Sequence, residues 1–201
     1  MTKEEICKAL RINVNEVLNI YPYGSKIYGN NDEFSDDDFI IVYKKSLLPS
    51  GAFKDNAISS YDRTIQGTCY SRGGFLDAIN NYQISALECI FLPENKIIKN
   101  TMKFKINKYN EHYLVKNIIS SASGSWHNAK LAYKDENHEY VRKNIFHSLR
   151  ILDFGSQIKE HGKIINYSSM NELKKEIYGL DICKPKDYHN IFIEMSNNLK
   201  N

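Results

Sequence analysis

Apolar and polar residues follow two different spacings in the first half of the sequence. Residues 3–18 place an apolar side chain at every fourth position, which is the spacing of an amphipathic helix with one buried face. Residues 19–25 predict a short strand that enters a tight turn at Gly24, and the apolar run at residues 38–44 predicts a second strand. We therefore expect a helix followed by two neighbouring strands with a loop between them.

The alternation of helix and strand continues to about residue 100. Residues 47–62 are rich in Pro, Gly, Ser and Asn and predict a loop, whereas residues 63–71 predict a third strand. Residues 73–84 predict a short helix with one apolar face. The apolar run at residues 86–93 ends at a proline, and we interpret it as a fourth strand.

The spacing of apolar residues changes near residue 105. Three segments, at residues 111–134, 138–162 and 169–179, carry apolar side chains three and four positions apart. Two of these segments end at glycine, where helices commonly stop. The sequence therefore predicts an α+β protein, with a mixed domain at residues 1–104 and a helical region at residues 105–201.

Composition and charge exclude several classes of protein. The net charge of +3 is too small to indicate nucleic-acid binding by itself. No stretch of 18 apolar residues occurs, and the first residues lack an apolar signal segment, so we expect neither secretion nor a membrane span. Four cysteines lie far apart without a CxxC pair, which argues against a zinc cluster or a disulfide framework and favours a reducing cytoplasm. They are Cys7, Cys69, Cys89 and Cys183.

A glycine-serine turn and a run of aspartates precede the second predicted strand. Asp36 and Asp38 lie two residues apart, so they project to the same face if the strand begins there. Such carboxylates repel each other, and a divalent cation such as Mg²⁺ removes the conflict by coordinating both. Gly24 and Ser25 offer backbone amides and a hydroxyl that can approach phosphate oxygens. In the alternative interpretation the segment is only a solvated loop, because turns favour these residue types in any case.

The segment from Tyr23 to Phe39 resembles the signature of the DNA polymerase beta superfamily of nucleotidyltransferases. In that signature an apolar residue is followed by Gly and Ser, a gap of about ten residues, and then Asp, an apolar residue, Asp and another apolar residue. This chain has "YGS", ten residues, and "DDDF", with Asp37 in the apolar position. The frequent "GSRAYG" appears as "GSKIYG", with Lys26 where an arginine usually stands.

The resemblance extends, less sharply, to a subgroup of predicted bacterial and phage nucleotidyltransferases. Two later stretches carry it, "FLDAINNYQISALECIFLP" and "VRKNIFHSLRILDFGSQIKEHG", so that it covers about residues 20–178. It implies a mixed sheet with flanking helices that moves a nucleoside monophosphate from an NTP, ATP among them, to an acceptor hydroxyl. The acceptor, an RNA 3′ end or a protein side chain, stays open, as do the base of the NTP and the oligomeric state.

The resemblance also implies a set of metal ligands. Two Mg²⁺ ions, for which Mn²⁺ could substitute, would be held by Asp36, Asp38 and Glu88, with Glu88 projecting from the fourth predicted strand. A charge flanked by apolar residues is seldom left without a partner, which also favours a ligand role for Glu88. Asp62, just before the third strand, is the second candidate for the third carboxylate.

Six residues are candidates for nucleotide binding, because they offer small, hydroxyl or cationic groups to phosphates. They are Gly24, Ser25, Lys26, Ser35, Lys130 and Lys134. The first four lie in or beside the acidic turn. The last two lie four residues apart on one predicted helical face, close to Trp126, which could stack on a base or pack in the core.

Two other functions remain as alternatives. Arg142 and His147 form an R-x4-H spacing that resembles the catalytic motif of HEPN ribonucleases, although an offset of five does not place two residues on one helical face. The third possibility is an inactive module that binds a nucleotide or a partner, which Asp37 in the apolar position would permit. The presence of both Asp36 and Asp38 favours an active enzyme.

Overall fold

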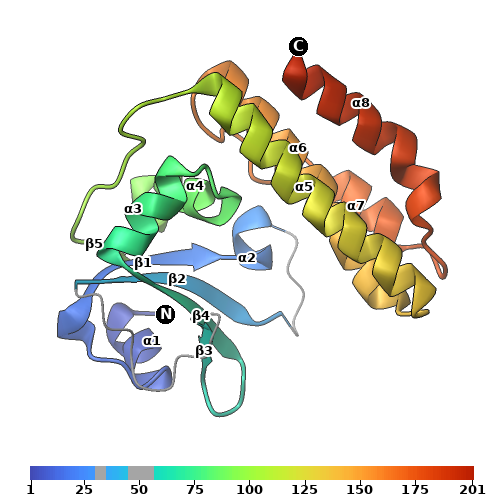
Figure 1. The fold of residues 1–201 in the computed structure, drawn as a ribbon. Coiled ribbons are helices and arrows are strands. Elements are labelled where there is room, and N and C mark those ends of the chain that lie inside the picture. Colours follow the sequence, from blue (N-terminus) through green and yellow to red (C-terminus); the bar gives the residue numbers. More distant parts are fainter. Residues whose placement is uncertain (30–34, 45–56) are drawn as a thin grey trace. The chain divides into compact units, whose positions relative to one another are not determined.

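The computed structural model describes residues 1–29, 35–44 and 57–201, which divide into two compact units (Figure 1). The first unit comprises residues 1–80 and 85–107, and the second comprises residues 81–84 and 108–201. The predicted α+β class is confirmed, because the first unit contains a mixed sheet with flanking helices and the second is helical. Within the described ranges, no helix has the length and apolar character needed to cross a membrane.

The sheet of the first unit has the strand order β3-β4-β2-β1-β5 in the described residues. β2 and β4 are parallel, and the other neighbouring strands are antiparallel. The elements are α1 (Lys3–Ala9), a 3-10 turn (Val14–Glu16), β1 (Val17–Tyr23), α2 (Ser25–Tyr28), β2 (Asp37–Tyr43), β3 (Ala57–Ser59), β4 (Ile65–Ser71), α3 (Arg72–Asn80), α4 (Ile84–Ile90), a second 3-10 turn (Glu94–Lys96) and β5 (Lys99–Asn100). The strands predicted at residues 19–25, 38–44 and 63–71 and the helix predicted at 73–84 are thus confirmed.

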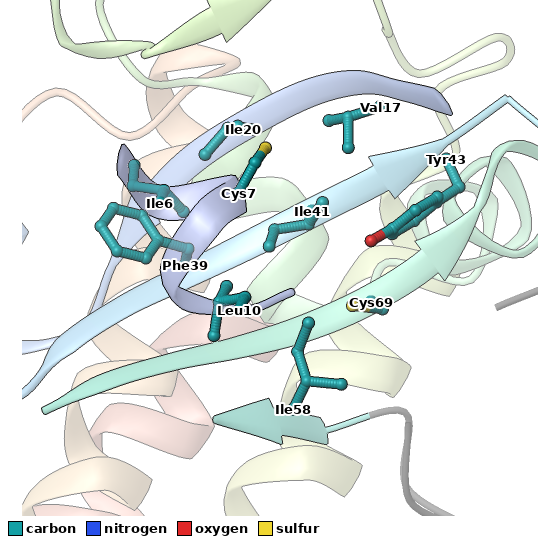
Figure 2. Close-up of a cluster of buried hydrophobic side chains, with 10 residues drawn as sticks. All are labelled: Ile6, Cys7, Leu10, Val17, Ile20, Phe39, Ile41, Tyr43, Ile58 and Cys69. Atoms are coloured by element: carbon teal, nitrogen blue, oxygen red, sulfur yellow. The ribbon is translucent and has the colours of Figure 1, made fainter. Parts of the chain in front are cut away.

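One face of the sheet is covered by α1, whose apolar side chains point onto the strands (Figure 2). Side chains two residues apart along a strand share a face, so alternate residues of β2 meet this helix, whereas a register shift after Val17 brings Val17 and Ile20 of β1 to the same face. The buried cluster consists of Ile6, Cys7, Leu10, Val17, Ile20, Phe39, Ile41, Tyr43, Ile58 and Cys69. The cluster fixes β2, and with it the strand end that carries the aspartates.

Aromatic residues cover the opposite face of the sheet. Phe75 of α3 stacks on Tyr21 of β1 with ring centroids 5.7 Å apart, and meets the ring of Tyr70 of β4 at 5.5 Å. The ring of Phe104 packs on the ring of Phe75, with centroids 5.0 Å apart. Such pairs add to the apolar area that the rings bury. The sheet is therefore the middle layer of three.

The N-terminal helix is shorter than predicted. It ends at Ala9, and Arg11 then takes a left-handed backbone conformation with φ +57°. Residue 14 lies in a 3-10 turn and residue 18 lies in β1, where it is half-buried. The spacing of four continues through these two residues although they lie outside the helix, so the predicted helix ran on into β1.

Two further predictions in the first unit need correction. Part of the loop predicted at residues 47–62 is β3, and residues 47–56 of that loop lie outside the described residues. The prediction of a fourth strand at residues 86–93 is wrong, because residues 84–90 form the helix α4. Ala86, Leu87 and Cys89 have no exposed surface. A helix buried on all sides shows no polar stripe, so a short apolar run of this kind resembles a buried strand.

The second unit is built from helices, as the spacing of apolar residues predicted. They are α5 (Glu111–Lys134), α6 (His138–His161), α7 (Asn171–Tyr178), a 3-10 turn (Pro185–Tyr188) and α8 (His189–Lys200). Figure 1 shows α5, α6 and α8 side by side, and Gly162 ends α6 in the left-handed conformation. Trp126 is buried and stacks on Phe192 of α8 at 4.6 Å, so it belongs to the core of this unit.

Two glycines inside these helices are expected to respond oppositely to alanine. A Cβ at Gly155 in α6 would overlap Cγ2 of Ile118 in α5 and lie 3.2 Å from its Cβ, whereas a Cβ at Gly124 would meet nothing within 4 Å. Gly155→Ala should lower the free energy of unfolding by about 1–3 kcal/mol through overpacking. Gly124→Ala should raise it by up to about 1 kcal/mol through helix propensity. Urea unfolding of both variants measures the difference, and a stabilised Gly155→Ala would contradict the tight helix contact.

Candidate functional site

The glycine-serine turn lies directly against one of the predicted aspartates. β1 and β2 are antiparallel and pair Tyr23 with Asp38, so Gly24, the next residue, is beside the Asp38 side chain. Gly24 is buried and has φ +77° and ψ −157°, a region that only glycine occupies readily. A Cβ at this position would overlap the Asp38 carboxylate and lie 3.1 Å from Asp38 Cβ. Glycine is thus needed both for the backbone and for the close approach.

Asp36 lies one residue before β2 and is exposed. The side-chain amide of Gln66 donates a hydrogen bond of 2.6 Å to Asp36 Oδ2. Gln66 belongs to β4, where it pairs with Asp38 across the parallel ladder. Asp36 and Asp38 are therefore tied to the same end of two adjacent strands, with the turn at Gly24 on the third.

Lys26 and Asp37 form an ion pair beside this turn. Lys26 Nζ lies 2.6 Å from Asp37 Oδ1, and the two side chains are 39% and 28% exposed. Asp37 is adjacent to Asp38 in β2, so it projects to the other face of the strand. The lysine predicted to assist with phosphate is thus engaged with the aspartate in the apolar position of the signature. Exposed pairs of this kind contribute up to about 1 kcal/mol to stability.

Glu88 lies in a helix and not in the predicted strand, and its surroundings differ from those of the aspartates. It is 2% exposed, and the hydroxyl of Tyr28, at the end of α2, donates a hydrogen bond of 2.5 Å to Glu88 Oε2. In the part of the chain that the structure describes, no three His, Cys, Asp or Glu side chains form a group able to hold a metal ion. Asp36, Asp38 and Glu88 are therefore not brought together as a three-carboxylate site.

Asp62, the second candidate for the third carboxylate, organises the turn between β3 and β4. Its Oδ1 accepts hydrogen bonds from the hydroxyl of Ser60 at 2.6 Å, and from the backbone N–H and hydroxyl of Thr64 at 3.1 and 2.9 Å. The bond from Ser60, followed by those from Thr64, lowers the pKa of the Asp62 carboxyl. Its role in the structure is that of a turn-forming residue.

The remaining nucleotide-binding candidates are spread over both units. Ser25 is the first residue of α2, and Ser35 directly precedes Asp36. Lys130 and Lys134 are exposed on α5 of the second unit. Their predicted contact with a triphosphate stays a prediction.

Two partners in the site were missed by the sequence analysis. Tyr28 is part of "GSKIYG", yet its partner Glu88 lies 60 residues further along the chain. Gln66 is one polar residue in a strand of mixed character, and no spacing marks it as the partner of Asp36. Both contacts depend on the pairing of elements that are distant in sequence, so a pattern search could not find them.

The R-x4-H pair is used for contacts within the second unit. Arg142 Nη1 donates to the backbone carbonyl oxygens of Leu180 at 2.9 Å and Asp181 at 3.3 Å. His147 Nδ1 lies 2.9 Å from Arg150 Nη2. Burial of the ring, followed by the charges of Arg150 and Lys143, lowers the pKa of His147 to about 3. These contacts bind Arg142 and His147 to different partners and do not join the two side chains to each other.

The lowered pKa of His147 has a consequence for stability. Its pKa in the folded protein lies below the ordinary value of 6.5, so protons bind the unfolded chain more tightly and stability falls as the pH drops from about 6.5 towards 3. Between pH 7.5 and pH 5 we expect His147 to account for a loss of about 2 kcal/mol. Urea unfolding of wild type and His147→Gln at both pH values measures this, and equal losses in the two proteins would contradict it.

The comparisons with known proteins find similarity among solved structures. No family model and no curated protein matches the sequence. Among solved structures, the chain is similar to a nucleotidyltransferase-like protein from Exiguobacterium sibiricum 255-15, with 13% identity and a TM-score of 0.31, over 92% of this chain and 68% of that one. A likeness at this level shows nothing about the residues of the site.

Proposed function

We propose that the protein transfers a nucleoside monophosphate from an NTP to an acceptor hydroxyl. One observation carries the proposal, namely that the turn at Gly24 closes directly on the Asp38 carboxylate. A turn without Cβ admits phosphate oxygens to backbone amides, and a carboxylate at the same point suits the cation that accompanies a triphosphate. Both parts of a magnesium-bound NTP therefore have partners at this end of the sheet.

The donor chemistry of the site fits Mg²⁺. In proteins this ion is usually bound by one or two carboxylates together with substrate phosphates, and Asp36 and Asp38 supply two carboxylates. They would hold the ion, which would offset charge on the α-phosphate and the leaving pyrophosphate. We propose these two ligands in place of a three-carboxylate, two-ion site that includes Glu88, because Glu88 is buried against Tyr28.

The neighbouring side chains orient these groups. The amide of Gln66 restricts the Asp36 carboxylate by donating to one oxygen and leaving the other available. Lys26 offsets the charge of Asp37, which lowers the negative charge that an approaching triphosphate meets at this run of three aspartates. Ser25, at the start of α2, would donate its hydroxyl to a phosphate oxygen.

The acceptor is proposed to be the 3′ end of an RNA or a protein side-chain hydroxyl, and the reaction to take place in the cytoplasm. Each hypothesis concerns groups outside the turn, so the chemistry of the turn can be tested independently of them.

The proposal is tested by supplying each of the four α-³²P NTPs with Mg²⁺, together with pooled RNA and protein acceptors. We expect transfer of label to one acceptor class, lost in EDTA and restored by Mg²⁺ or Mn²⁺. If no label is transferred and no NTP binds saturably, the proposal fails. Saturable binding without transfer would identify a binding module, and metal-independent cleavage of the RNA would identify a ribonuclease.

A further inference from the structure

We infer that Glu88 is a positioning residue that holds the turn at Gly24 and Ser25 against Asp38, and that it acts through Tyr28. The inference deepens the proposed function and rests on it for its effect on catalysis. Its structural part, the anchoring of α2 by Glu88, stands on the hydrogen bond from Tyr28 to Glu88 and on the burial of both side chains.

The turn needs an anchor because α2 is very short. It has four residues between Gly24 and Gly29, and a helix of one turn is not stable without tertiary contacts. Its last residue, Tyr28, is 3% exposed and points its hydroxyl to the Glu88 carboxylate. The surface pair of Lys26 with Asp37 holds the other side of α2 and is open to solvent. The buried bond from Tyr28 is therefore the firmer of the two.

The position of Glu88 suits this role better than that of a metal ligand. Leu87 and Cys89 on either side have no exposed surface, so α4 is fixed in the core and holds the carboxylate rigidly. A ligand that must meet a dissolved NTP lies where solvent reaches, as the exposed Asp36 does. Burial of a carboxylate is costly, and the hydrogen bond from Tyr28 offsets part of that cost. The burial of the Glu88 carboxylate is consistent with its role as the acceptor of the hydrogen bond from Tyr28 of α2.

Glu88→Gln and Tyr28→Phe separate the two roles, because glutamine keeps an oxygen acceptor for Tyr28 but is a poor ligand for Mg²⁺. Glu88→Gln should keep kcat within about threefold of wild type, with unchanged dependence on Mg²⁺. Tyr28→Phe should raise KM for the NTP about tenfold with a smaller change in kcat, and should speed amide hydrogen exchange of residues 24–29 about tenfold. Tyr43→Phe, which removes a buried hydroxyl at the other end of β2, is the matched control and should change neither.

The outcomes distinguish the inference from the proposed function. If Glu88→Gln abolishes transfer while exchange of residues 24–29 stays as in wild type, Glu88 is a ligand and the inference is overturned. If wild type itself transfers nothing, the proposed function fails, and hydrogen exchange alone decides the structural part. Faster exchange in Tyr28→Phe than in Tyr43→Phe then supports the anchoring of α2, and equal exchange overturns it.

Discussion

Asp38→Asn is expected to reduce the rate of nucleotide transfer at least about a hundredfold at saturating NTP and Mg²⁺. The asparagine side chain keeps the shape of the aspartate but loses the charge that binds a cation and balances the triphosphate. Because Asp38 lies against the Gly24 turn, the same change also weakens the contact that brings the two halves of the site together. Single-turnover transfer of α-³²P label measures the rate, and unfolding by urea measures the stability of the variant.

Asp62→Asn is the comparison that gives this result its meaning. Asp62 forms the turn after β3 through bonds from Ser60 and Thr64, so its replacement should lower stability while the transfer rate stays near that of wild type. A loss of rate equal to that of Asp38→Asn would return Asp62 to the list of metal ligands. A transfer rate in Asp38→Asn within a few-fold of wild type would remove Asp38 from the mechanism.

The elements that the sequence predicted correctly are those whose burial follows one simple period. In α5 apolar residues recur three and four apart because one side of the helix packs on its neighbours, and Gly162 marks the end of α6. β1 and β2 were predicted from apolar runs next to turn residues. α4 was missed because it is buried all round, and α1 was extended too far because the spacing of four continues through residues 14 and 18, which lie outside the helix.

The site could be predicted only as far as its parts are local. Gly24 and Asp38 lie at the facing ends of one antiparallel pair, so a spacing in the sequence places them together. The partner of Glu88 is another matter, because it depends on where α4 packs, and the apolar flanks of Glu88 suggested only that it has a partner. The hydroxyl of Tyr28 is one such partner.

Gly24→Ala is expected to abolish transfer and to destabilise the first unit by about 3 kcal/mol. Its backbone, with φ +77° and ψ −157°, is strained for any residue with a Cβ, and such strain costs about 1–3 kcal/mol. The added methyl would also overlap the Asp38 carboxylate and push it away from the turn. Urea unfolding and the labelling assay on the same preparation give the stability and the rate together.

Gly162→Ala separates the backbone strain from the contact with Asp38. Gly162 also has a positive φ, +70°, but a Cβ there would meet nothing within 4 Å. Its replacement should cost about 1 kcal/mol of stability, the penalty of the left-handed conformation, and leave transfer unchanged. If Gly24→Ala lost no more stability and no more activity than Gly162→Ala, the close approach of the turn to Asp38 would not matter for function. A loss confined to Gly24→Ala would show that transfer needs the close contact between the turn and Asp38, and not only a relaxed backbone.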